Sequence, residues 1–302
     1  YMENLKINGN VAFQEENHKY FDLDNPSNTY ISVTTLIEKF AQPFDKDFWS
    51  KYKALEKLLP SDAWMIEKKS ILATHKIPKE ILNTYSISEL DLNRTQQDIL
   101  DEWDKTNAES CERGTKIHAD LENSMYKMGA NVSLKKFGVG GKFVCDKGRT
   151  ALDLENGVYP EYLISRVSQD GALRIAGQID LLVKKDNEIY ILDWKTNKEI
   201  KQKAGFNTQT RSEVKMLYPL NLLPDCNYYH YALQLSTYAW MLQMINPDFV
   251  IKDLILVHFD HNNNQTVYNM PYLKKEVESM LKFYKKSIFK QEKLAKLKKI
   301  EY

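Results

Sequence analysis

The feature that most constrains the fold is a run of three apolar segments between residues 161 and 196, separated by two tight-turn sequences. The segments contain EYLISRVS, LRIAGQIDLLV and EIYILDWKT, and Asp-Gly and Asp-Asn turns lie between them. Runs of β-branched and aromatic residues bounded by Asp, Asn or Gly are typical of strands joined by hairpins. The sequence therefore predicts an antiparallel three-strand meander.

Two acidic residues interrupt these apolar segments. Asp180 and Asp193 each stand among Ile, Leu, Val and Tyr, where an unpaired carboxylate is costly to bury. If residues 186–187 form a two-residue turn, counting outward along both strands places Asp180 directly opposite Asp193. If residues 170–171 form the preceding turn, the same counting places Glu161 opposite Asp180. The turns therefore predict three carboxylates in one row across three adjacent strands.

Such a row is electrostatically unfavourable without a cation. Directly opposed side chains have Cβ atoms about 4.5–5.5 Å apart, and like charges at that separation repel. Alternation along the strand places Lys195 on the same face as Asp193. Mg²⁺ prefers carboxylate oxygens as ligands and keeps waters for substrate phosphates. The row therefore indicates a divalent-cation site, although edge-strand acids exposed to solvent and paired with Lys195 remain an alternative at this point.

The residues that alternate with this row are apolar and predict a buried face. We expect them to pack together against a core helix, and they are Ile164, Ile175, Ile179, Leu181, Val183, Tyr190 and Leu192.

The rest of the chain predicts helices on either side of the meander. Residues 44–127 are mostly helical in pattern, with breaks at Pro60 and Pro78, and a second long helix ends at Asn246-Pro247. A strand at 253–260 and a lysine-rich amphipathic helix follow. We expect an α/β (α+β) fold with a mixed central sheet, formed by the meander and a further strand, flanked by helices and preceded by a helical N-terminal region.

We expect three regions along the chain. Residues 1–105 would form an N-terminal accessory region of short strands and then helices, residues 106–270 the core, and residues 271–302 the lysine-rich terminal helix.

Composition limits the classes of function. The formal net charge of the 302 residues is only +1, so a nucleic-acid surface would have to come from local clustering. The three cysteines form no CxxC pair, which argues against a zinc ribbon or a disulfide framework. No apolar run has the length of a membrane span. We expect a protein of a reducing, cytoplasm-like compartment with no membrane partner.

The spacing of Glu161, Gly177-Gln-Ile-Asp180 and Asp193-Trp-Lys195-Thr resembles the PD-(D/E)xK nuclease signature. More narrowly, it resembles the RecB-like exonuclease branch, which includes Cas4-like and phage recombination exonucleases. Arg113-Gly-Thr-Lys-Ile-His118 is similar to the RGxxxH element of that branch, and Gln234-Leu-Ser-Thr-Tyr238 to its QxxxY helix. The segments His18-Lys-Tyr20 and Ser32-Val-Thr-Thr resemble the openings of phage-encoded members. The motifs from 111 to 260 cover roughly half of the chain.

The resemblance implies a restriction-endonuclease-like core and a site that binds one or two Mg²⁺ or Mn²⁺ ions. It implies that Lys195 positions or activates the attacking water, and that Gln234 and Tyr238 organise the site and contact DNA. The implied metal ligands are His118, Glu161, Asp180, Asp193 and the backbone carbonyl of Trp194. Three scattered cysteines cannot hold the iron–sulfur cluster found in some relatives, so no such cluster is expected.

The expected function is a metal-dependent DNA exonuclease used in phage or bacterial recombination, repair or DNA processing. DNA is the expected partner, with a single-strand annealing protein or a helicase as a candidate protein partner. The residues expected to contact nucleic acid are Arg113, Thr196, Lys198, Lys201, Lys203 and Arg211. The alternatives are a structure-selective endonuclease or RNA nuclease with the same site, and an inactive nuclease-fold DNA-binding protein.

Other aromatic residues of the QxxxY helix have a simpler interpretation. Tyr228, Tyr229, Tyr231 and Trp240 are expected to pack in the core rather than to serve the site.

Overall fold

A computed structural model of the protein describes residues 5–128, 132–145 and 153–300, with residues 292–300 described by their backbone alone. Its centre is the predicted meander, formed by β7 (Gly157–Val167), β8 (Arg174–Lys185) and β9 (Glu188–Lys195). The predicted further strand, β12 (Val250–Phe259), pairs parallel to β9, and β13 (Gln265–Met270) pairs antiparallel to β12. The structure confirms the α/β class with a mixed central sheet.

Four short strands at the N-terminus extend the same sheet. They are β1 (Leu5–Asn8), β2 (Val11–Gln14), β3 (Lys19–Asp22) and β4 (Thr29–Ser32), joined as antiparallel neighbours. The last of them pairs parallel to the first half of β8. The sequence predicted short strands in this region but not that they would join the central sheet.

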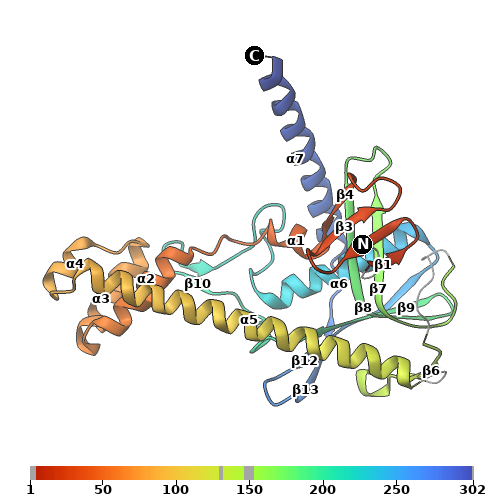
Figure 1. Ribbon diagram of the computed structural model, residues 1–302, viewed down its shortest axis with the longest axis horizontal. Coiled ribbons are helices and arrows are strands. Elements are labelled where there is room, and N and C mark those ends of the chain that lie inside the picture. Colours follow the sequence, from red (N-terminus) through yellow and green to blue (C-terminus); the bar gives the residue numbers. More distant parts are fainter. Residues whose placement is uncertain (1–4, 129–131, 146–152, 301–302) are drawn as a thin grey trace.

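The helical N-terminal region forms as predicted. Pro60 and Pro78 lie directly before two of its helices, where the missing N–H of proline costs nothing. Figure 1 shows α2 to α4 at the far end of the long α5, away from the sheet. The boundary expected between residues 105 and 106 lies inside α5. The helices are α1 (Val33–Glu38), α2 (Lys46–Leu58), α3 (Ser61–Thr74), α4 (Lys79–Thr84) and α5 (Glu89–Lys127).

The two remaining long helices follow the meander. The QxxxY helix is α6 (Asn227–Ile245), which ends as predicted at Asn246. The terminal helix α7 (Lys274–Ile300) packs on α6 through its first turns and then leaves the body of the protein (Figure 1). Among the described residues, no helix is long and apolar enough to cross a lipid bilayer.

The central sheet is buried on both faces, so the prediction of a single apolar face is wrong. Ile164, Ile175 and Ile179 pack in the cluster that contains α6. Leu181 and Leu192, with their neighbours Val183 and Tyr190, belong to a second cluster that includes side chains of α5. A strand that is covered on both sides is apolar at consecutive positions, which the alternation rule does not anticipate.

The predicted strand register is confirmed. Lys185 pairs with Glu188 and Leu181 with Leu192, so Asp180 and Asp193 occupy the next opposed positions. In the β7–β8 ladder the pairs on either side leave Glu161 opposite Asp180. Residues 169 and 172 were expected to close the β7–β8 hairpin, but Ser168 and Leu173 close it, which leaves a loop of four residues in place of two. The Ser168 hydroxyl stabilises this loop by accepting a hydrogen bond from the Leu173 N–H. The longer loop keeps the same register.

The packing of α6 on the sheet depends on the absence of a side chain at Gly177. A Cβ atom at this position would lie 2.6 Å from Cε1 and 2.9 Å from the hydroxyl oxygen of Tyr238. Both distances are shorter than real Cβ contacts, so helix and strand would have to separate or Tyr238 would have to move.

We expect Gly177→Ala to lower the free energy of unfolding by about 1–3 kcal/mol, the usual cost of overpacking a core. Gly205→Ala is the matched control, because a Cβ atom there meets no heavy atom within 4 Å. Urea denaturation of both variants beside the wild type measures the difference. Equal unfolding midpoints for the two variants would contradict this account of the contact.

Candidate metal site

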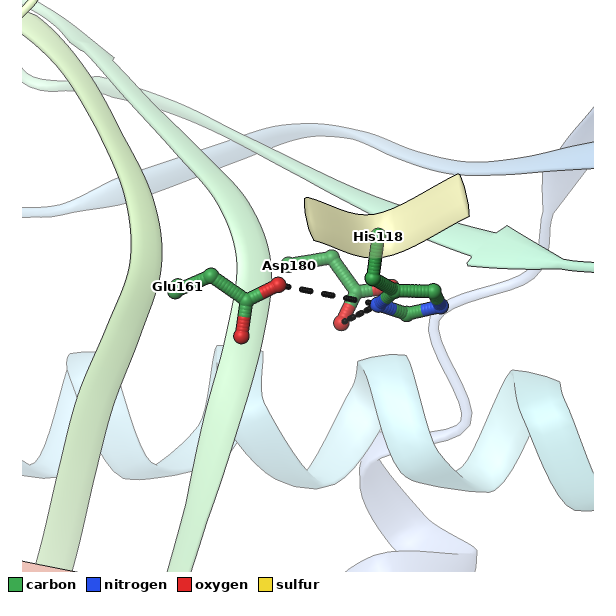
Figure 2. Close-up of side chains that lie close together, drawn as sticks. All are labelled: His118, Glu161 and Asp180. Atoms are coloured by element: carbon green, nitrogen blue, oxygen red, sulfur yellow. Dashed lines mark ion pairs between the residues drawn. The ribbon is translucent and has the colours of Figure 1, made fainter. Parts of the chain in front are cut away.

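Three potential metal ligands from three elements converge beside the sheet, as Figure 2 shows. His118 comes from α5, Glu161 from β7 and Asp180 from β8. Nδ1 of His118 lies 3.6 Å from Oε1 of Glu161 and 3.5 Å from Oδ1 of Asp180. One ligand atom from each of the three residues lies within 4.8 Å of the other two.

Backbone geometry directs Glu161 toward the cluster. Its φ of 51° lies in the left-handed region, which residues other than glycine adopt uncommonly. The β7–β8 ladder skips this residue although the pairs on both sides are made. An interruption of this kind re-aims a side chain and often lies next to a functional site.

Asp193 lies at the next position in the row but contacts other partners. Its Oδ1 accepts a hydrogen bond from Nε2 of Gln234 at 2.9 Å, and its Oδ2 lies 2.6 Å from Nζ of Lys195. Oδ2 is buried and, among the described residues, receives no hydrogen bond of good geometry. The structure therefore brings Lys195 to the acidic row as predicted, and leaves one buried carboxylate oxygen with an ionic contact alone.

The neighbouring backbone of Trp194 fixes both an acid and the histidine. The Trp194 N–H donates to Oδ2 of buried Asp180 at 2.7 Å. Its carbonyl oxygen lies 3.2 Å from Nε2 of His118. A histidine that binds a metal through one nitrogen commonly donates its other N–H to a carbonyl, which holds the ring in place. The arrangement leaves Nδ1 of His118 directed at the two carboxylates.

The spacing and chemistry of this cluster fit a divalent cation. Ligand atoms about 2.1 Å from an octahedral Mg²⁺ ion are separated from one another by roughly 3.0 to 4.2 Å. The separations of 3.5 and 3.6 Å from Nδ1 to the two carboxylates fall within this interval. Two carboxylates and one imidazole form a donor set suited to Mg²⁺ or Mn²⁺.

Electrostatics shift the protonation of the cluster. Burial and the Asp193 carboxylate raise the pKa of Asp180 to about 8. Burial alone would lower the pKa of His118, but the carboxylates of Asp180 and Glu161 outweigh it and raise that pKa to about 9. At neutral pH the cluster without a cation therefore retains protons, which a bound cation would displace.

Lys195 is held by a residue that the sequence analysis assigned to packing. Nζ of Lys195 lies 4.8 Å from the ring centroid of Tyr231, a cation–π distance, while the Tyr231 hydroxyl donates to Asn197 at 2.5 Å. Burial lowers the pKa of Lys195, but Asp193 and Asp180 outweigh it and the pKa is raised overall. The lysine is therefore an ammonium group, fixed between Asp193 and Tyr231. The position of Tyr231 three residues before Gln234, on the same face of α6, was the available sequence signal.

The two QxxxY residues lie together beside the acidic row. Nε2 of Gln234 is 3.5 Å from the Tyr238 hydroxyl and also donates to Asp193. Tyr238 is buried against Gly177, and burial holds its pKa well above its usual value. Asp193 is therefore fixed from α6 as well as from its own strand.

The residues expected to contact nucleic acid are placed differently from one another. The guanidinium group of Arg113 donates to the carbonyl oxygens of Thr196, at 2.9 Å, and Asp260. Lys198 and Thr196 line a cleft together with Lys195. The other three, Lys201, Lys203 and Arg211, are exposed on the connection between β9 and α6 and are absent from that cleft among the residues described.

Two clefts meet at His118. The first, of about 450 Å³, is bounded by the metal cluster and by residues of the N-terminal strands such as Lys6 and His18. The second, of about 610 Å³, lies between α5 and the end of β9 and contains Trp103 and Lys195. His118 lines both clefts, whereas Glu161 and Asp180 line the first.

Comparisons with known proteins agree with this geometry. The model of the PD-(D/E)XK nuclease superfamily matches residues 130–298, more than half of the chain. No curated protein matches the chain.

Two solved structures show a low similarity. The structure of the protein SSO0001 has 14% sequence identity and a TM-score of 0.33, with 85% of this chain and 74% of that chain covered. A candidate exonuclease from Eubacterium rectale has 11% identity and a TM-score of 0.28, with 43% of each chain covered. At these scores neither structure bears on the function of this chain.

Saturating Mg²⁺ should raise the melting temperature of the wild type by several degrees, on the order of 5 °C for a ligand at about 100 times its Kd. Asp180→Asn keeps the acceptor for the Trp194 N–H but removes a ligand charge, so its rise should be less than half as large. Asp120→Asn, an exposed acid on the same helix as His118, should rise like the wild type. Thermal denaturation with and without Mg²⁺ measures all three, and equal shifts in the wild type and Asp180→Asn would contradict the site.

Proposed function

The chain belongs to the PD-(D/E)XK nuclease superfamily, and on that premise we propose that it is a divalent-metal-dependent DNA exonuclease. The observation that best supports metal dependence is the convergence of His118, Glu161 and Asp180. The superfamily makes nucleic acid the substrate class. The preference for DNA and for chain ends is our proposal, motivated by the RGxxxH and QxxxY elements of the RecB-like branch.

We propose that the cation binds His118, Glu161 and Asp180, with Asp193 as a further oxygen donor beside them. We assign the Trp194 carbonyl, which was expected as a ligand, to holding the His118 ring instead, because it lies 3.2 Å from Nε2, the ring nitrogen that faces away from the cation. Mg²⁺ or Mn²⁺ in such a site acidifies a bound water and stabilises charge on the phosphate. Neighbouring groups orient the two aspartates by hydrogen bonds. The Trp194 N–H donates to Asp180, and Gln234 donates to Asp193. These contacts keep the carboxylates in place although they repel one another.

Lys195 would act as a fixed positive charge. Its raised pKa keeps it an ammonium group, so it can donate hydrogen bonds to an attacking water or to a phosphate oxygen but cannot accept a proton. Asp193 and Tyr231 hold Nζ from two sides. A charge fixed in position before the reaction stabilises a transition state at little reorganisation cost.

We assign Arg113 a positioning role in place of the expected contact with nucleic acid. Its guanidinium group joins α5 to the ends of β9 and β12 through their carbonyl oxygens. This clamp holds His118, five residues further along α5, against the strand that carries Asp193 and Lys195. Lys198 remains the best placed of the expected basic contacts, because it lines the cleft that contains Lys195.

Other assignments are less well supported. A structure-selective endonuclease or an RNA nuclease could use the same residues, and an inactive DNA-binding protein would be expected to lack one of them. The complete set of acids and lysine favours an active enzyme. We also propose that the protein acts in the cytoplasm of a bacterium or of a phage-infected cell. Its candidate protein partner there is a single-strand annealing protein or a helicase.

We expect the wild type to degrade end-labelled linear DNA in Mg²⁺ or Mn²⁺ and to lose this activity in EDTA. Asp193→Asn and Lys195→Ala should each reduce the rate by at least about 100-fold, because each removes a charged side chain that would stabilise the transition state. Asp120→Asn serves as the control and should keep the full rate. Degradation that persists undiminished in both site variants would exclude the assignment.

The same assay separates an exonuclease from an endonuclease. Circular single-stranded and duplex DNA should survive while linear DNA of the same sequence is degraded. Cleavage of the circles, or of RNA in preference to DNA, would replace the exonuclease proposal with the corresponding alternative.

A further inference from the structure

The N-terminal strands reach the metal cluster although they lie outside the matched residues 130–298. Lys6 on β1 has its Nζ 3.6 Å from Oε2 of Glu161. The side chain of Lys6 is 37% exposed and that of Glu161 is 13% exposed. One end of Lys6 therefore contacts a candidate metal ligand while the side chain remains accessible from solvent.

The cleft around Lys6 is strongly acidic. Four carboxylates line it, from Glu15, Glu122, Glu161 and Asp180, and Lys6 is the single lysine or arginine among the described lining residues. A nucleic-acid strand entering this cleft carries one negative charge per phosphate and would meet these acids. A positive side chain in the cleft, in addition to the metal cluster, therefore favours entry of the strand.

The pairing of Lys6 with Glu161 is easily exchanged. The contact is long for an ion pair and partly exposed, which makes its contribution to stability small. Glu161 has a second partner, because Nε2 of Gln178 donates to the same Oε2 at 2.5 Å. A divalent cation bound by Glu161 would repel the ammonium group and leave it to pair with another anion.

The His18-Lys-Tyr20 segment lies at the same cleft. Both His18 and Tyr20 line it. The backbone of His18 has a φ of 52°, and its ring centroid lies 5.1 Å from that of Phe13. Lys19 between them is exposed and is absent from the lining. The N-terminal strands thus bring Lys6, His18 and Tyr20 to the cleft, whereas Lys19 is not among its described lining residues.

We propose that Lys6 binds a backbone phosphate of the nucleic-acid strand next to the metal cluster, so that the N-terminal strands β1 to β3 form one wall of the substrate site. This inference rests on the proposed function, since it takes nucleic acid as the ligand. It places one positive side chain in each of the two clefts that share His118, Lys6 in the first and Lys195 in the second.

The test is binding of a short fluorescein-labelled DNA strand, measured by anisotropy in Ca²⁺ between about 50 and 200 mM salt. Lys6→Gln should weaken binding about tenfold at low salt and reduce the slope of log K against log salt by about one. Lys6→Arg should keep the wild-type slope. The matched control, Lys19→Gln, removes the same charge from β3 of the same group of N-terminal strands and should bind like the wild type.

A salt slope for Lys6→Gln equal to that of the wild type would overturn the proposal, whatever the change in affinity. So would an equal loss in Lys19→Gln, which would show a general effect of charge. Failure of the proposed function appears elsewhere, as the absence of Mg²⁺-dependent cleavage by the wild type. Circular dichroism of each variant, expected to match the wild type, shows whether a loss of binding comes from unfolding.

Discussion

The strand register forces three carboxylates together, and the rest of the site has to offset their mutual repulsion. Asp180 and Asp193 are both buried and opposed, and Glu161 lies beside them. A local partner offsets the negative charge of each acid. The Trp194 N–H contacts Asp180, the Lys195 ammonium group contacts Asp193, and the His118 ring contacts Glu161. These partners moderate the repulsion but leave pKa values shifted far from their usual range, which is typical of functional sites.

The fold supplies the rigidity that such a site needs. The sheet is covered on both faces, so the strands that carry the acids cannot slip without moving two cores. The helices on those faces each bring one polar group to the row, His118 from α5 and Gln234 from α6. Close contact between Gly177 and Tyr238 and the clamp made by Arg113 set the distances of these helices from the strands.

Local sequence information was enough for the features that depend on neighbouring residues. Tight turns fixed the register, so the row of Glu161, Asp180 and Asp193 could be predicted by counting. The capping and breaking signals located the helices, and the family resemblance supplied His118. Although the role of each residue remains a proposal, the structure does bring His118, Glu161 and Asp180 together.

Contacts between distant segments could not be predicted in this way. Lys6 is 155 positions from Glu161, and no periodicity links β1 to the meander. Tyr231 was assigned to packing with the aromatics around it. Its spacing from Gln234 indicates a shared helix face, but only the three-dimensional position of Lys195 reveals the cation–π contact. The burial of the sheet on both faces likewise depends on where α5 packs against it, which alternation along a strand does not encode.

The most direct test of the central claim is anomalous diffraction from crystals soaked in Mn²⁺. The account predicts one strong peak within about 2.3 Å of Nδ1 of His118 and of carboxylate oxygens of Glu161 and Asp180. The absence of a peak at these residues, or a peak only at surface acids, would contradict it. In that case the opposed aspartates would need an explanation other than a cation.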